Sequence, residues 1–311
     1  MKVSLVATVK DAAPHVGEFL RAVAAQTRPP DEVVVVDGGS TDGTLEVLRS
    51  APGVTLIEEP GANIARGRNL AVATAAHDVI AVTDADCAPA PDWLERLLEP
   101  IEAGADVAMG LYRPAPGSLF QTLAGAIAVP DPEEVREERF MPSARSVAFR
   151  REALERAGGY PEWLEVGEDM YVDRRWRALG VRMRLAPGAV VSWPMRADLP
   201  SLWRQYFRYA RGDALAGMYP HRHLVRFAAY GALAAALVAR RPLPLALLAG
   251  AGAAYAARRV RRALRRTTRP LERAAAVVGV PALMAIVDAA KMAGYLSGLL
   301  ERARRGPVRR R

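Results

Sequence analysis

The chain has 311 residues, 51% of them hydrophobic, which is enough for one large domain or for a domain with an appendage. Its 43 Lys and Arg exceed its 34 Asp and Glu mostly because of the region after Trp203, where arginines flank apolar runs. This pattern favours an anionic membrane surface over a nucleic acid, since the sequence has no zinc-finger spacing and no aromatic RNA-binding motif.

Cysteine usage and the N-terminus bear on the compartment. The single cysteine, Cys87, excludes an internal disulfide and fits a reducing environment. The first apolar run, residues 3–6, is too short for a signal peptide. We therefore expect the front of the protein to stay in the cytoplasm.

The first hundred or so residues alternate between short β-branched runs and segments with helical spacing. Strands are predicted over residues 3–9, 32–36, 54–57, 79–83 and 107–111, and helices over 14–26, 40–48, 63–76 and 91–101. The run 33–36 is apolar on both faces, as a central parallel strand requires. The alternation predicts right-handed βαβ units and a mostly parallel sheet, with ligands at the carboxyl ends of the strands.

Two acids follow the fourth predicted strand directly, in the triplet Asp84-Ala85-Asp86. Carboxylates two residues apart at a strand end suit a hard divalent cation, Mg²⁺ or Mn²⁺, and a sugar-ribose hydroxyl. The alternative is an ordinary turn, because Asp and the nearby Pro89 both favour one.

A glycine-rich stretch, Asp37–Thr44, follows the second predicted strand. Its glycines permit tight turns and close approach of a ligand, and the Asp37 carboxylate is placed to accept a hydrogen bond from a base. A simple strand-to-helix connection, with Ser40 or Thr41 as the cap, explains the same residues. The stretch lacks the Gly-x-Gly-x-x-Gly spacing of dinucleotide sites, which argues against a dehydrogenase.

Four elements in this order and spacing resemble the family 2 glycosyltransferases: Thr8, Val36–Thr44, Ala65–Asn69 and Thr83–Asp86. The resemblance covers about residues 1–215. It implies an α/β fold, a GT-A nucleotide-sugar-binding domain with a mostly parallel mixed sheet over 1–215. C-terminal hydrophobic, membrane-associated helices would follow over 216–311.

The resemblance also implies roles for individual residues. It gives Thr8 and Asp37 contacts to the nucleotide base, Asp84 a contact to the ribose, Asp86 the metal, and either Arg66 or Arg68 a place near the base or diphosphate. The metal shell beyond Asp86 stays open, because the stretch 191–196 lacks a histidine that related enzymes often carry there.

A later acidic pair, Glu168-Asp169, stands at the start of a predicted helix. Acids at a helix N-terminus are stabilised by the helix dipole, so capping alone explains them. The resemblance instead makes the pair catalytic, with Asp169 as the base of an inverting transfer. The turn Gly158-Gly159-Tyr160 before the pair would shape the acceptor side.

The segment Leu202–Gly212 is aromatic and basic, and resembles the Gln-x-x-Arg-Tyr-x-Arg-Gly segment of succinoglycan-biosynthesis-type members. We expect an amphipathic helix at the membrane, near the acceptor or diphosphate. A generic interfacial helix accounts for the same pattern.

The tail has three apolar runs, over residues 227–239, 243–257 and 274–300. The first two are each shorter than the roughly 20 residues that span a bilayer, and predict a hairpin, one kinked span or interfacial helices. The third contains Asp288 and Lys291, which are spaced to pair with each other. The basic loop expected over 258–273 would lie in the cytoplasm, so that the first two runs cross as a hairpin and the third lies at the interface or re-enters. A soluble helical bundle is the alternative.

The sequence thus predicts an inverting, metal-dependent glycosyltransferase at the cytoplasmic face of the membrane. Its donor would be a nucleotide sugar, UDP-sugars being the family's commonest, and its acceptor lipid-linked or a saccharide, with no nucleic acid as partner. One alternative is a membrane-bound nucleotide-sugar-binding or scaffold protein without turnover. A nucleotidyltransferase is disfavoured, because residues 8–14 form no basic glycine-rich loop.

Overall fold

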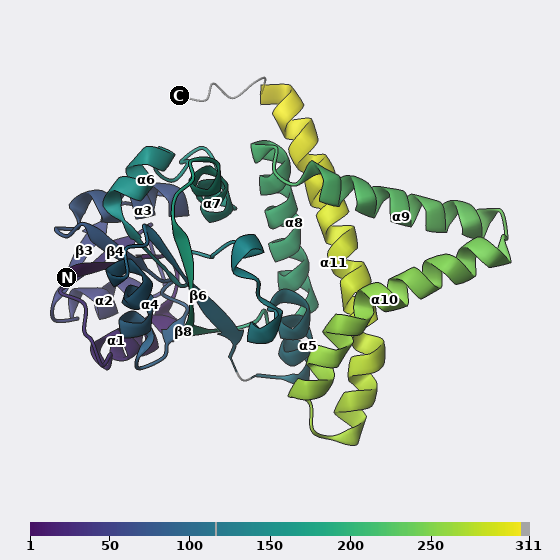
Figure 1. Ribbon diagram of the computed structural model, residues 1–311, viewed down its shortest axis with the longest axis horizontal. Coiled ribbons are helices and arrows are strands. Elements are labelled where there is room, and N and C mark those ends of the chain that lie inside the picture. The colour runs from purple at the N-terminus through teal and green to yellow at the C-terminus, as the bar shows by residue number, and fades with distance from the viewer. Residues whose placement is uncertain (116, 306–311) are drawn as a thin grey trace. The chain divides into compact units, whose positions relative to one another are not determined.

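The computed structural model describes residues 1–115 and 117–305, which divide into two compact units (Figure 1). The first unit comprises Met1–Ala115 and Pro132–Pro194, and the second Pro116–Asp131 and Met195–Arg311. Helix α8 (Leu199–Ala216), which we expected at the end of the catalytic domain, belongs by its packing to the second unit. That residues 1–215 form the catalytic domain stays a prediction.

A single mixed sheet forms the centre of the first unit, with strand order β3-β2-β1-β4-β7-β6-β8-β5. Four of its seven strand pairings are parallel, which confirms the predicted sheet. The strands are β1 (Val3–Val9), β2 (Glu32–Asp37), β3 (Val54–Glu58), β4 (Val79–Val82), β5 (Ala88–Pro89), β6 (Val107–Pro114), β7 (Val147–Arg150) and β8 (Met183–Trp193).

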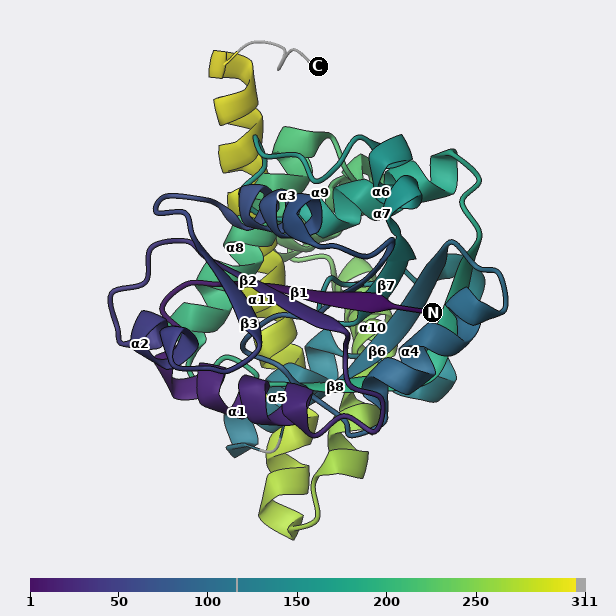
Figure 2. The same cartoon turned by 90° about the vertical axis from the view of Figure 1, so that its left-hand side faces the viewer.

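Helices cover both faces of the sheet (Figure 2). One face carries α1 (Ala13–Ala24), α2 (Thr44–Arg49) and α4 (Trp93–Glu102), and the other carries α3 (Ile64–Thr74), α6 (Arg151–Ala157) and α7 (Glu168–Ala178). Two short 3₁₀ turns, Pro132–Glu134 and Glu137–Arg139, lie before β7. The helices that precede β6 match the predicted ones to within a few residues.

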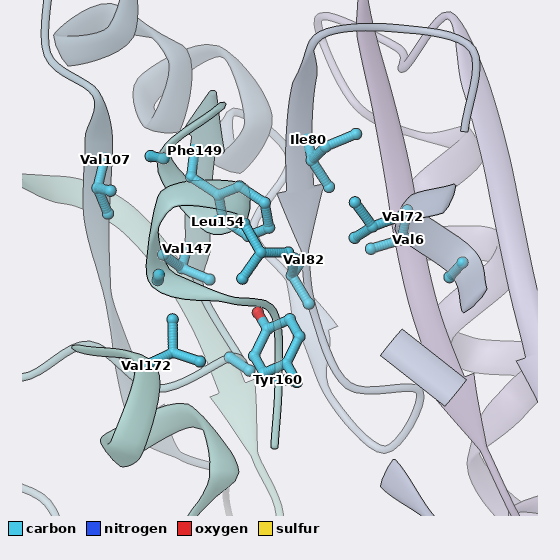
Figure 3. Packing of buried hydrophobic residues seen from close by; sticks show 14 of the residues in the cluster. Val6, Val72, Ile80, Val82, Val107, Val147, Phe149, Leu154, Tyr160 and Val172 are labelled. Atoms are coloured by element: carbon cyan, nitrogen blue, oxygen red, sulfur yellow. The ribbon is translucent and has the colours of Figure 1, made fainter. Parts of the chain in front are cut away.

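The core between the sheet and the helices α3, α6 and α7 follows the alternation of the strands (Figure 3). Alternate residues of each strand, such as Ile80 and Val82 on β4, point to this side. The helices contribute residues such as Leu154 and Val172, and Tyr160 closes the cluster near the start of α7. The intervening strand residues are also buried, as expected for a sheet covered on both faces.

The second unit contains five helices among the described residues: α5 (Leu119–Ala128), α8, α9 (Pro220–Val238), α10 (Pro242–Arg266) and α11 (Pro270–Arg305). The basic region predicted as a loop is mostly the last turns of α10, so this prediction was wrong. Arginines there have partners within the unit: Arg262 donates to the Ala126 carbonyl near the end of α5, and Arg266 pairs with Asp131 at 2.6 Å. Such contacts supply hydrogen bonds to carbonyls at the end of α5 and stabilise the last turns of α10 as a helix.

Of the helices in the described residues, only α11 is long and apolar enough to cross a membrane. The predicted crossing hairpin of the first two runs is therefore not supported by length and composition, because polar and basic residues begin α9 and end α10. The expected pairing of Asp288 with Lys291 is also replaced: Asp288 pairs with Arg226 of α9 at 2.7 Å.

Candidate active site

The glycine-rich stretch after β2 forms a tight turn held by Asp37. This carboxylate accepts hydrogen bonds from the backbone N–H groups of Gly39 and Ser40, each at 2.8 Å, and from the Ser40 hydroxyl. Gly39 has φ +92°, a backbone conformation that residues other than glycine rarely adopt. Asp37 therefore holds the turn and keeps a further lone-pair position as an acceptor.

Thr8 lies close to the carboxyl end of β1 against the first turns of α3. A Cβ on Gly67 would come within 2.9 Å of the Thr8 methyl carbon, so only glycine lets the helix pack this closely on the strand. The Thr8 hydroxyl is buried and has no hydrogen-bond partner among the described residues. A buried polar atom without a partner at this edge of the sheet is suited to a ligand.

The two arginines that the sequence left as alternatives lie in different surroundings. Arg66 is exposed and pairs with Glu59 at 2.6 Å. Arg68 is buried: one guanidinium nitrogen lies 2.8 Å from Asp84 Oδ1, and another pairs with Glu168. The structure therefore brings Arg68, and not Arg66, together with the predicted acids.

The charges of this cluster adjust one another. Burial raises the pKa of Asp84, but the guanidinium groups of Arg68 and Arg145 outweigh burial and hold that pKa below its usual range. Burial and the neighbouring Asp169 carboxylate raise the pKa of Glu168 to about 7, against the opposing charge of Arg68. Asp84 is therefore ionised at neutral pH, whereas the Glu168 carboxyl titrates close to neutral pH.

The second predicted acid of the pair, Asp169, borders a small pocket among largely buried side chains, which is too narrow to hold a water molecule. Helix α7 has Gly167 with φ +90° at its N-cap, and both acids lie in its first turn. Asp169 Oδ1 accepts a hydrogen bond of 2.8 Å from the Met170 N–H, so the pair also stabilises the start of the helix. Asp169 Oδ2 lies 3.4 Å from both the Ser143 hydroxyl and the Ala144 N–H. The pocket is lined by Ser143, Ala144, Val147, Tyr160, Asp169, Val172, Asp173 and Trp176.

Asp173 stands one turn after Asp169 on α7 and also lines the pocket. It is 2% exposed, and its Oδ2 atom has no partner among the described residues. Burial, together with the Asp169 charge, raises the pKa of Asp173 well above its usual value. Its spacing of four residues from Asp169 was a visible signal, which the sequence interpretation did not use.

Asn69 and Arg145 are further site residues to which the sequence interpretation gave no role. The Asn69 side chain exchanges hydrogen bonds of 2.8 and 2.9 Å with the backbone of Tyr160, which fixes the Gly158-Gly159-Tyr160 turn. Arg145 lies 3.6 Å from Asp84 and 4.0 Å above the Trp193 ring. Nothing in the residues around Arg145 signals this position; the order β4-β7-β6-β8 places it there.

Asp86, the predicted metal ligand, is half-buried and lies 3.5 Å from the Cys87 sulfur. Burial and the adjacent Asp86 raise the pKa of Cys87, so this buried thiol stays protonated at neutral pH. Within residues 1–115 and 117–305, no group of three or more His, Cys, Asp or Glu is arranged to hold a metal. One carboxylate fits a cation that takes its other ligands from substrate phosphates and water.

Comparisons with known proteins bear on the family and the fold of the chain. Residues 4–155 match Glycosyl transferase family 2. Glycosyltransferase AglE of Haloferax volcanii is 27% identical over 222 residues, which are 68% of this chain and 72% of the relative. Succinoglycan biosynthesis protein ExoA of Rhizobium meliloti is 30% identical over 218 residues, covering 65% of this chain and 66% of the relative.

Among solved structures, the mannosyltransferase PcManGT of Pyrobaculum calidifontis is similar in fold. The TM-score is 0.59 with 23% sequence identity, and the match covers 97% of this chain and 88% of that protein. The likeness shows that the first unit has the GT-A fold. Together, the motif order, the fold and the relatives show that the chain belongs to glycosyl transferase family 2.

Proposed function

We propose that this glycosyltransferase is an inverting enzyme that moves a sugar from a nucleotide sugar to an acceptor hydroxyl, with Asp169 as the base. The observation that supports this most is the convergence of Asp84, Arg68 and the Glu168-Asp169 pair. These residues come from a strand end and two helices and meet at one edge of the sheet. Of the two acids, Asp169 lines the pocket and Glu168 does not, as far as the structure describes the chain.

The donor would be held by the residues at the carboxyl ends of β1, β2 and β4. Asp37 offers its remaining acceptor position to the base, and the Thr8 hydroxyl is free to bond nearby. Two guanidinium groups keep Asp84 ionised, so its carboxylate can accept a charge-assisted hydrogen bond from a ribose hydroxyl. Arg68, rather than Arg66, is the arginine that stands close to these groups.

In the transfer step, Asp169 accepts the proton of an acceptor hydroxyl within hydrogen-bond reach. The acceptor oxygen then forms its bond to the anomeric carbon while the bond to the nucleotide diphosphate breaks on the opposite face, which inverts the configuration. Ser143 and the Ala144 N–H lie close enough to Asp169 Oδ2 to orient it.

Asp86 would hold Mg²⁺ or Mn²⁺, which when bound neutralises charge on the leaving diphosphate. The structure of PcManGT contains GDP-Man and Mn²⁺, which supports a divalent metal here. Excess chelator should abolish turnover, and Asp86→Ala should remove the metal dependence of nucleotide binding. Calorimetric titration of UDP and GDP with and without Mn²⁺ measures this, and full activity in chelator would contradict a metal role.

The test of the base is Asp169→Asn, which keeps the size of the side chain but removes proton acceptance. General-base catalysis contributes about 10²–10⁴-fold, so kcat should fall on that order. Nucleotide affinity should change little, because Thr8, Asp37 and Asp84 are unaltered. A panel of nucleotide sugars with Mn²⁺ or Mg²⁺, followed by detection of released nucleotide, identifies the donor on which both proteins are compared.

Near-normal turnover in the Asn variant would exclude Asp169 as the base. Donor binding without turnover in the wild-type protein, on any acceptor offered, would instead favour a nucleotide-sugar-binding protein. We propose a lipid-linked or polysaccharide acceptor at the cytoplasmic face of the membrane. The relative ExoA, by its name a succinoglycan biosynthesis protein, and the apolar helix α11 support this.

A further inference from the structure

The two acids that begin α7 are neighbours in the chain, but their side chains have different surroundings. Asp169 is half-buried and lines the pocket together with Ser143 and Tyr160. Glu168 is 5% exposed, and its carboxylate accepts a hydrogen bond from the Arg68 guanidinium. The position of Asp169 suits contact with an acceptor, whereas the position of Glu168 suits contact with another part of the protein.

Arg68 connects Glu168 to the donor side of the site. It is 2% exposed, it contacts Asp84 at 2.8 Å with its second terminal nitrogen, and it lies 5.6 Å from the centre of the Tyr160 ring. A guanidinium is planar and holds its donors in a fixed fork, so two carboxylates bound at its two ends are oriented relative to each other. A rotation of Arg68 away from Glu168 would therefore move the guanidinium N–H group that donates a hydrogen bond to Asp84.

The balance of charge gives the same dependence. Asp84 has a second cation, because Arg145 Nε lies 3.6 Å from its Oδ2. Without the negative charge of Glu168, Arg68 would have only Asp84 as an anionic partner. Arg68 and Arg145 would then share the Asp84 carboxylate in a different geometry. Buried ion groups that lose one partner reorganise, because the remaining charge is costly to leave uncompensated.

We propose that Glu168 is a positioning residue, which acts through Arg68 to hold Asp84 in the orientation that binds the donor, and that it is not the proton acceptor. This rests on the proposed function, since it takes Asp84 as a donor contact. The pKa of Glu168, raised by burial to about 7, would suit a general base. A base must also reach the acceptor, however, and the Glu168 carboxylate is bound by Arg68.

The experiment separates donor binding from turnover in the full chain. The dissociation constants of GDP and UDP with Mn²⁺ are measured by calorimetry, and kcat and the donor KM by nucleotide release. In Glu168→Gln we expect the nucleotide Kd and the donor KM to rise on the order of tenfold, as the loss of one charged contact implies. The fall in kcat should be much smaller than the roughly 10²–10⁴-fold expected for Asp169→Asn.

Three further variants test whether the effect passes through Arg68. Arg68→Lys loses the fork and should raise Kd as Glu168→Gln does, and the double variant should be no worse than Arg68→Lys alone, because residues that act as one unit are not additive. Glu168→Asp keeps the charge and should restore part of the affinity. Glu155→Gln, on an exposed residue of α6, is the matched control and should change neither constant.

A wild-type Kd in Glu168→Gln with kcat lowered about 100-fold or more would identify a proton acceptor and overturn the proposal. A Kd and kcat both equal to wild type would also overturn it. If circular dichroism shows that Glu168→Gln does not fold, Arg68→Lys and Glu168→Asp decide, and an unchanged Kd in both contradicts the proposal. A wild-type chain that binds no nucleotide with Mn²⁺ would contradict the proposed function itself, and is recognised before any variant is made.

Discussion

Asp173 is a buried acid whose protonation affects folding as well as the site. Its pKa is raised well above the usual value by burial, and an unfolded Asp titrates near about 3.9. As pH rises above that value, the unfolded chain releases the proton while the folded chain keeps it. The folded state therefore loses stability with rising pH, at about 1.4 kcal/mol per pH unit, until the folded carboxyl titrates.

We predict that Asp173→Asn removes this loss, so that the variant gains stability relative to wild type as pH is raised from 5 to 7. Thermal or urea unfolding of the full chain at the two pH values measures the difference. Asp106 is the control of opposite sign, because hydrogen bonds from Arg182 hold its pKa below the usual range. Asp106→Asn should lose stability near neutral pH, and an Asp173→Asn variant that behaves the same way would contradict the prediction.

The choice between Arg66 and Arg68 shows how far sequence reasoning reached at single residues. Two positions two apart on a helix point to nearly opposite sides, so one of them must face the core. Arg68 lies on the stripe of Ala65 and Val72, spaced by three and four residues, whereas Arg66 lies off it. The apolar spacing thus contained the answer, but an arginine on an apolar stripe is unexpected until its two acids, distant in the chain, are known.

At the scale of elements, β1 to β4, β6 and the helices between them were predictable because each has a clear period and its turn residues. β5, β7 and β8 were not predicted, and β5 has only two residues. β7 has only four residues, and β8 contains Pro187 and Gly188 next to a register irregularity at Gly110 and Leu111 of β6. A Cβ at Gly110 would lie 1.9 Å from the Ser146 hydroxyl oxygen, a constraint that depends on a neighbouring strand and is invisible in the local sequence.

The same limit explains which parts of the site were found. Thr8 and Asp37 lie at the ends of predicted strands, and Asp84 and Asp86 follow one directly, so their common edge could be inferred. Arg145 lies on the irregular segment before β7, and only the antiparallel insertion of β7 beside β4 brings it to Asp84. Long-range pairing of this kind is set by the whole sheet and leaves no local pattern.

At the scale of the whole molecule, the two units differ in what they expose. Large hydrophobic side chains that are more than half exposed all lie in the second unit, among the residues that the structure describes. A concentration of large exposed apolar side chains in one unit suits contact with a membrane or a partner. The arginines that end α10 stand next to it in the sequence, as at the boundary of a bilayer.

We predict that the full chain is recovered in the membrane fraction and resists both high salt and a carbonate wash, with α11 as its anchor. Only 39% of the apolar window of α11 is buried within the structure, which leaves most of it for lipid. Val277→Glu with Val278→Glu alters two exposed positions of α11. A charge within a bilayer costs up to about 2.5–3.5 kcal/mol at its centre, so this variant should be released by carbonate.

Leu243→Glu with Leu247→Glu on α10 is the matched control, since these positions are also exposed but lie on a helix that does not meet the length and composition of a span. It should weaken attachment less than the α11 pair does. The opposite ranking would mean that α9 and α10 lie on the membrane surface and that α11 is an internal helix of its unit. A wild-type chain found wholly in the soluble fraction at low salt would contradict membrane attachment, and would make the helical unit a soluble bundle.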